Sequence, residues 1–197
     1  MKKALTYDDI NIVPKYSELE SRSDVDLSTK FTKKIKLSIP VVSTPMDTVT
    51  EYDMAREMMD WGGAGIVHRF MSIEEQAGIM EKLWYIPGTD HIVVKNNLPR
   101  CAAIGVKGDY LERAQELVKN GCNVLLIDVA HGHHKLVGEA IEEVKTKLSG
   151  VEIIAGSVAT GEACEYLCEK GADSIRVGIG NGSLCETRIR TGVGIPQ

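Results

Sequence analysis

The chain alternates between short apolar runs and longer amphipathic segments from residue 39 onward. The apolar runs are four to six residues long and lack the alternation of a half-exposed strand, which is typical of strands buried on both faces. We expect strands at Ile39–Ser43, Gly65–His68, Ala102–Val106, Val124–Val129, Ile153–Val158 and Ser174–Gly178. Apolar residues three and four apart predict helices at Glu51–Trp61, Ile73–Leu83, Asp109–Asn120, Lys135–Leu148 and Gly161–Lys170.

Strands that alternate with helices of this length indicate a parallel sheet with right-handed crossovers. Six such units in succession favour a (β/α)8 TIM barrel over a doubly wound sheet, and this chain would supply about the first six βα units. We expect an N-terminal arm at residues 1–36 and a TIM-barrel catalytic domain at 37–197, with strands seven and eight outside this chain. The irregular stretch from Tyr85 to Pro99 is the expected site of a variable insertion.

Composition narrows the class of protein but not its chemistry. The 197 residues are 43% hydrophobic and 26% charged, which suits one soluble domain. A formal net charge of −5 argues against a nucleic-acid partner, and no apolar run reaches the length of a membrane span. We therefore expect a cytoplasmic protein.

The chain has five cysteines, an odd number without the density of a disulfide framework, so we expect reduced thiols. Cys164 and Cys168 lie four residues apart on one predicted helix, and we expect both to pack in the core. Cys185 is different, because it follows the glycine-rich stretch Gly178-Ile179-Gly180-Asn181-Gly182-Ser183-Leu184.

Glycines at alternate positions let a loop adopt positive φ and turn its amides and carbonyls toward a ligand. Such a loop can hold a phosphate or a cation while it presents one thiol at its rim, where amide dipoles and cations favour the nucleophilic thiolate. The alternative is a glycine-rich turn that ends in a small buried cysteine.

Other reactive side chains follow the predicted strands. In a βα barrel, functional groups lie at the carboxyl ends of the strands, so these residues should share one rim with Cys185. They are Ser43, Met46, His68, Arg69, Asp128, His131, His133, His134 and Ser157. Alternatively, Asp128 caps the next helix, the histidines are polar loop residues, and Arg69 is solvated or salt-bridged.

Four segments together resemble the IMP dehydrogenase and GMP reductase family. They are Ser21–Leu27, Pro45–Val49, Asp128–His133 and Gly178–Cys185, and the closing Thr191–Gln197 also fits. The resemblance implies a tetrameric (β/α)8 enzyme that acts at C2 of a purine nucleoside monophosphate (GMP, IMP or XMP), with NADP(H) or NAD(H) as cofactor.

The same resemblance implies roles for individual residues. Cys185 matches the nucleophile that forms a thioimidate with C2, and Thr187 the threonine that handles water or ammonia there. Ser183 matches a contact to the substrate phosphate, and Gly182, Ser43 and Met46 match other substrate-binding positions. Asp128, Val129, Ala130 and Arg69 match the cofactor side. The backbone carbonyls of Gly180, Gly182 and Cys185 match ligands of a monovalent cation such as K+.

Residue details favour a GMP reductase, with an IMP dehydrogenase lacking the regulatory CBS insertion as the alternative. Residues 73–99 leave no room for that insertion, and Val129-Ala130 and Arg190-Thr191 are reductase-like, whereas Val42–Glu51 and Ile104–Lys107 are dehydrogenase-like. Three positions depart from the family pattern: Arg69 replaces a reductase lysine, Ser157 an asparagine, and Glu186 is an unusual neighbour of the nucleophile.

Two further hypotheses come from other classes. One is a metal-dependent hydrolase that uses His131, His133, His134 and His68. The other is an inactive fragment or assembly partner that retains the surface of the half-barrel.

Overall fold

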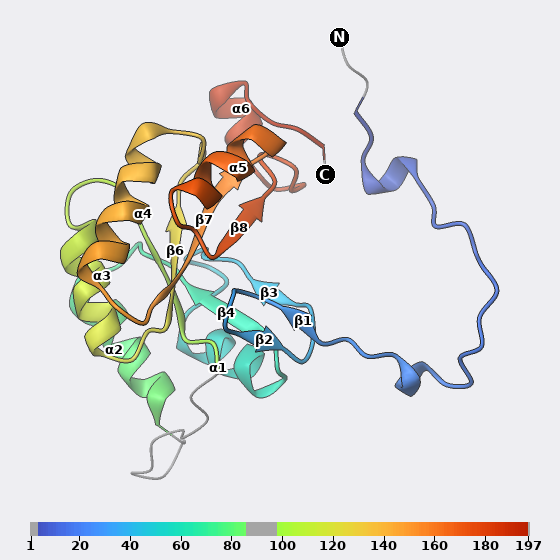
Figure 1. Ribbon diagram of the computed structural model, residues 1–197, viewed down its shortest axis with the longest axis horizontal. Helices are drawn as coiled ribbons and strands as arrows, with labels where there is room; N and C mark the ends of the chain where they lie inside the picture. The colour runs from blue at the N-terminus through green and yellow to red at the C-terminus, as the bar shows by residue number, and fades with distance from the viewer. Residues whose placement is uncertain (1–3, 86–97, 197) are drawn as a thin grey trace.

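A curled parallel sheet of six strands forms the centre of the molecule (Figure 1). The computed structural model describes residues 4–85 and 98–196, so the predicted insertion site at 85–99 lies almost wholly outside the described residues. The strands neighbour one another in chain order and are β3 (Val42–Ser43), β4 (Ala64–Val67), β5 (Cys101–Ile104), β6 (Val124–Asp128), β7 (Glu152–Val158) and β8 (Ser174–Val177). The fold is a half-barrel, as the first six units of a TIM barrel require, and this confirms the predicted fold class.

Five helices cover the outer, convex face of the sheet (Figure 1). They are α1 (Tyr52–Asp60), α2 (Ile73–Trp84), α3 (Tyr110–Lys119), α4 (Lys135–Lys147) and α5 (Gly161–Glu169). Local signals fix their starts: the Ser72 hydroxyl accepts from the Glu75 amide in a capping box, and the Thr160 hydroxyl accepts from the Ala163 amide. A short sixth helix, α6 (Thr187–Thr191), was not predicted. None of the described helices is both long and apolar enough to cross a membrane.

Side chains of each strand alternate between two cores. On β6, Leu125 and Ile127 pack toward the helices, whereas Val124 and Leu126 face the concave interior of the half-barrel. All four are fully buried. Burial on both faces explains why the strands read as continuous apolar runs in the sequence.

An antiparallel hairpin closes the concave face at the amino ends of the strands. Its strands are β1 (Thr29–Lys30) and β2 (Lys36–Leu37), and Ile35 and Leu37 pack into the interior core. The turn of the hairpin is anchored by charge: the Lys34 amide donates to Glu152 Oε2 at 2.9 Å, and Lys33 Nζ lies 3.3 Å from Asp173 Oδ1. The hairpin therefore ties the start of the chain to the last two strands of the sheet.

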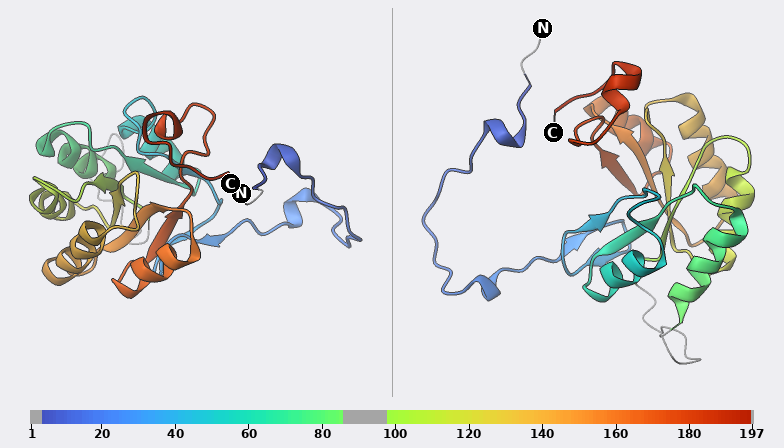
Figure 2. Two further views of the ribbon diagram at one scale, coloured as in Figure 1. Left: turned by 90° about the horizontal axis from the view of Figure 1, so that it is seen from above. Right: turned by 180° about the vertical axis from the view of Figure 1, so that it is seen from behind.

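The residues before the hairpin leave the body of the protein. Residues 4–28 form an extended, exposed segment with two short 3-10 turns at Tyr7–Asp9 and Arg22–Asp24 (Figure 2). The predicted arm of residues 1–36 is thus divided into an exposed part and a hairpin that packs on the sheet.

All five cysteines are free, as expected. Burial raises the pKa of the Cys122 thiol to about 12 and that of Cys101 well above its ordinary value. The expectation for the pair on α5 was half wrong: Cys164 packs against the core, but Cys168 is exposed. The buried face of α5 centres on Ala163 and Leu167, and four residues advance a helix by about 40°, which turns Cys168 further from the core than Cys164.

Candidate functional site

The loop after β8 departs from ordinary strand geometry at its glycines. Gly178 has φ of 121° and Gly180 has φ of 66°, which residues with a side chain rarely adopt. The Gly178 amide donates to the Val158 carbonyl at 2.8 Å, and the Cys185 amide donates to the Gly182 carbonyl at 3.1 Å. These bonds fold the loop back over the carboxyl end of the sheet and leave Cys185 at its rim.

Cys185 is exposed, so it is not the small buried cysteine of the alternative interpretation. Its Sγ lies 3.3 Å from Thr187 Oγ1. The hydroxyl and backbone of Thr187 lower the pKa of the thiol, and the backbone of Gly180 and the positive charge of Arg176 add to that effect. A thiol with a lowered pKa carries more thiolate at neutral pH, which is the form that attacks electrophiles.

Replacing Thr187 with valine should raise the pKa of Cys185, because the variant keeps the shape of the side chain but loses the hydroxyl. The rate of alkylation by iodoacetamide follows the thiolate fraction, so its midpoint should move to higher pH and the rate at pH 7 should fall about threefold or more. Mass spectrometry of each thiol over a pH series measures this. An unchanged Cys185 profile in Thr187→Val would contradict the assigned cause.

A pocket of about 470 Å³ lies at the carboxyl end of the sheet, beside Cys185. Residues at or just after the carboxyl ends of five of the six strands line it, which is the arrangement expected of a barrel active site. It brings together most of the candidate residues, namely Met46, Arg69, Asp128, Val129, Ala130, Ser157, Gly180, Gly182, Cys185 and Thr187.

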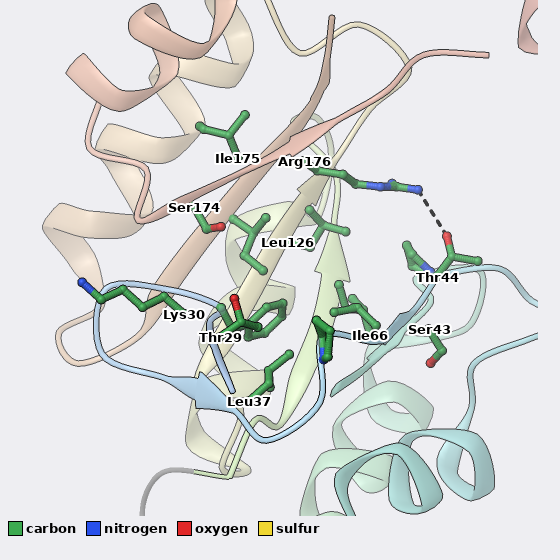
Figure 3. Close-up of a pocket in the computed structure, with 15 residues that line it drawn as sticks. Thr29, Lys30, Leu37, Ser43, Thr44, Ile66, Leu126, Ser174, Ile175 and Arg176 are labelled. Carbon is green, nitrogen blue, oxygen red and sulfur yellow. Dashed lines mark hydrogen bonds between the residues drawn. The ribbon is translucent and has the colours of Figure 1, made fainter. Parts of the chain in front are cut away.

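An ion pair crosses the floor of this pocket. Arg176 Nη1 on β8 donates to Asp128 Oδ1 at the end of β6 over 2.5 Å, and Arg176 Nη2 donates to Thr44 Oγ1 over 3.2 Å. Figure 3 shows Arg176 extending from β8 toward Thr44. Asp128 does not cap the following helix, because His134 takes that position. The pair with Arg176 was not predicted, and the charged residue within an otherwise apolar strand is the signal that marks it.

Arg69 and Phe70 form another wall of the pocket. The Arg69 guanidinium lies 5.3 Å from the centroid of the Phe70 ring, and its buried Nε has no hydrogen-bond partner among the described residues. Such an atom is costly to leave unsatisfied, and a ligand acceptor in the pocket would satisfy it. Arg69 as a whole is half-buried, so burial without a partner applies to its Nε alone within the described part of the chain.

A buried polar network that sequence reasoning missed supports this wall. Gln76 is fully buried and donates to the carbonyls of His68 at 3.0 Å and Ala103 at 2.9 Å. Its Oε1 accepts from Arg113 at 2.9 Å, and Arg113 also pairs with Asp109. A polar residue at a core position of an amphipathic helix was the available signal.

Two of the residues to which the resemblance gives a role, Ser43 and Ser183, do not line the pocket. Ser43 accepts from Thr50 Oγ1 at 2.9 Å and lines a separate cavity of about 410 Å³ within the half-barrel (Figure 3). Ser183 lines an adjoining hollow of about 570 Å³ with Arg188. Gly180, Gly182 and Cys185 line both this hollow and the pocket, so the two spaces meet at the loop after β8.

The four candidate histidines are dispersed: His131 is exposed, and the other three have structural contacts. His68 is buried and pairs with Glu51 at 3.1 Å, His134 accepts from the Leu136 amide at 3.1 Å, and His133 lies 5.3 Å from the Tyr166 ring. Within residues 4–85 and 98–196, no three His, Cys, Asp or Glu side chains come together as metal ligands. The described structure therefore gives the hypothesis of a histidine-based hydrolase no support.

Comparison with known proteins identifies the family of the chain. The family model described as "IMP dehydrogenase / GMP reductase domain" matches residues 4–197. The chain belongs to this family. Among curated relatives, the "Inosine-5'-monophosphate dehydrogenase" of Cryptosporidium parvum is 40% identical over 99% of the chain and 56% of its own length. The protein of that name from Borreliella burgdorferi is 37% identical over all of the chain and 58% of its own length.

The chain thus spans little more than half the length of these relatives. A third relative, the "Inosine-5'-monophosphate dehydrogenase" of Nitrosopumilus maritimus, is 30% identical and aligns over 310 positions, compared with 236 for the Borreliella protein. Members of the family therefore differ in how many residues they carry within the region that this chain matches.

Proposed function

We propose that the protein contributes to a purine nucleotide oxidoreductase that acts at C2 of a nucleoside 5'-monophosphate, converting IMP to XMP. The observation that carries the proposal is the position of Cys185, an exposed thiol of lowered pKa beside Thr187, at the rim of a pocket that also contains Asp128. A nucleophile, a hydroxyl and a carboxylate in one hollow suit covalent catalysis on a small polar ring.

The two adjoining hollows suit the two ends of a nucleotide. The base would lie in the pocket against Met46, with C2 over Cys185 Sγ. The phosphate would lie toward Ser183 and Arg188, because a hydroxyl and a guanidinium are ordinary phosphate donors. Gly182 lies between these positions, where a small residue lets the sugar pass close to the backbone.

Covalent addition divides a difficult substitution into two steps. The Cys185 thiolate would bond to C2, and after oxidation at that carbon the resulting thioimidate would be hydrolysed by water, which releases the thiol. Thr187 is near enough to the sulfur, at 3.3 Å, to orient that water.

The opposite wall of the pocket fits a dinucleotide cofactor. Asp128 offers a carboxylate to ribose hydroxyls, Phe70 an exposed aromatic face, and Arg69 a buried nitrogen without a partner among the described residues. Val129 and Ala130 complete this side. When bound, NAD+ supplies the acceptor for the hydride that leaves C2.

The relatives favour the dehydrogenase direction and NAD(H). The relatives at 37% and 40% identity are named as IMP dehydrogenases. The Borreliella protein aligns with the 197 residues over only 236 positions, so a protein of that name matches the chain without a long insertion. GMP reductase with NADPH is the second candidate. It is favoured by Val129-Ala130 after Asp128 and by Arg190-Thr191 before Gly192.

Absorbance at 340 nm tests the proposal directly, on the expressed protein with IMP and NAD+ in one cuvette and GMP and NADPH in another. A rise in the first supports the dehydrogenase, whereas a fall in the second supports the reductase. Flat traces together with no thermal stabilisation by IMP or GMP would contradict the proposal and favour the inactive form.

Three parts of the proposal stay predictions. They are a homotetramer, a cytoplasmic location, and a K+ site formed by the backbone carbonyls of Gly180, Gly182 and Cys185. Dependence of turnover on K+ at constant ionic strength would test the last of these.

A further inference from the structure

Arg176 and Asp128 occupy the same level of the sheet, two strands apart. In the parallel register, Gly156 on β7 is the partner of Asp128 on β6 and also of Arg176 on β8. A side chain that joins the outer two residues must therefore cross the middle strand at Gly156.

Gly156 provides the space for that crossing. A Cβ atom added at this position would lie 2.7 Å from the Arg176 Cβ and 2.6 Å from the Arg176 carbonyl oxygen. Contacts this short do not occur between unstrained atoms, so any larger residue at 156 would displace Arg176. The Arg176–Asp128 pair therefore depends on a glycine at position 156.

The second arm of the guanidinium reaches a different part of the rim. Its Nη2 donates to the Thr44 hydroxyl at 3.2 Å, and the Thr44 carbonyl is itself held by the buried Thr50 hydroxyl at 2.6 Å. Arg176 thus connects the loop after β3, the end of β6 and β8, whose following loop carries Cys185 (Figure 3 shows the arm toward Thr44). A planar fork makes two such bonds at once, which an ammonium on a flexible stem does not do with the same geometry.

We infer that Arg176 is the positioning residue of the site: it fixes the Asp128 carboxylate on the cofactor side and holds the two edges of the pocket at a constant separation. This inference rests on the proposed function, in which Asp128 receives the ribose of a dinucleotide. Arg176 acts through Asp128 and Thr44, and its positive charge additionally faces the thiol of Cys185.

Charged groups other than Arg176 also lie near Cys185 and bear on the pH profile of its alkylation. Arg69 and Asp128 line the same pocket, and Arg188 lines the adjoining hollow. Glu186 is paired with Arg190 at 2.5 Å, so this neighbour of the nucleophile is already compensated by a local cation. Arg176 is itself paired with Asp128, so we expect its contribution to the thiol to be small.

Two substitutions separate the geometry of Arg176 from its charge. Arg176→Lys keeps the charge but loses the fork, whereas Arg176→Gln loses both. The matched control is Arg56→Gln, which removes an arginine paired with Asp60 at 2.9 Å on the outer helix α1. Each protein is assayed for KM and kcat with NAD+ and IMP, for thermal stabilisation by NAD+, and for the pH profile of Cys185 alkylation.

If Arg176 positions Asp128, both of its variants should raise KM for NAD+ about tenfold, with a smaller change in kcat and less thermal stabilisation by NAD+. Alkylation of Cys185 at pH 7 should slow about twofold in Arg176→Gln and stay unchanged in Arg176→Lys. A lower melting temperature without these changes would overturn the inference, because it would indicate a merely structural role. So would full recovery of KM in Arg176→Lys.

The results that would reject the proposed function differ from those that would reject the inference about Arg176. A wild-type protein that shows no turnover and no stabilisation by IMP would reject the enzyme assignment. The inference about Arg176 is then decided by NAD+ stabilisation and by the alkylation profiles, and equal values in wild type and Arg176→Gln would reject it as well.

Discussion

Replacing Cys185 with alanine is expected to lower kcat by roughly a thousandfold or more, while IMP still stabilises the protein against heat. In the proposed mechanism the thiolate forms the bond to C2, so removal of this nucleophile would leave only binding and orientation to assist the reaction. The substitution should hardly affect folding, because the Cys185 side chain is exposed. Absorbance at 340 nm and a thermal shift with IMP measure the two effects.

Cys168→Ala is the matched control, since Cys168 is also an exposed cysteine but lies on α5, outside the residues that line the pocket. It should retain full activity. Activity near the wild-type level in Cys185→Ala would reject the covalent mechanism, even if the nucleotide still binds.

The second large effect is a loss of stability, expected when the close contact between β4 and α1 is disturbed. A Cβ atom at Gly65 would lie 2.5 Å from the Ala55 Cα, a backbone atom that cannot move aside without shifting the helix. Gly65→Ala should therefore lower the free energy of unfolding by about 2–3 kcal/mol, as overpacking of a close-packed core does. The urea midpoint of unfolding measures this.

Gly78→Ala is the matched control, and it should raise the free energy of unfolding rather than lower it. Gly78 lies within α2, and an added Cβ there meets no heavy atom within 4 Å. Because alanine is the better helix former, this variant should gain about 0.5–1 kcal/mol. A similar loss of stability in both variants would show that the packing at Gly65 is not the cause.

The sequence pattern was sufficient to predict the βα units, but not the hairpin that packs against the interior core. The predicted helix Ile73–Leu83 and the observed Ile73–Trp84 differ by one residue, because an amphipathic pattern and a Ser72 cap are local signals. Leu126 and Ile154 meet Leu37 in the interior core through a hairpin that no local signal places there. The predicted strand Ile39–Ser43 shrinks to Val42–Ser43, since a strand is defined by its hydrogen-bonded neighbour.

At the site, too, some features could be predicted from the sequence and others could not. Met46, Asp128 and Cys185 were expected at one rim because the carboxyl ends of parallel strands converge there, and the pocket contains all three. The Arg176–Asp128 pair spans 48 residues and depends on a glycine in the strand between them, which composition and spacing do not reveal. Ser43 instead accepts a hydrogen bond from Thr50 Oγ1 and lines the interior cavity rather than the pocket.

The hairpin anchors have a consequence for the order in which the protein folds. Lys34 and Glu152 are separated by 118 residues, and Lys33 and Ala172 by 139, so the hairpin cannot complete its docking until the chain has been synthesised past β7 and the start of β8. Contacts between such distant residues form late, because the loop that joins them must close first. During translation the hairpin should therefore remain undocked while the earlier βα units assemble, and it should dock only when the residues around β7 and the start of β8 are in place.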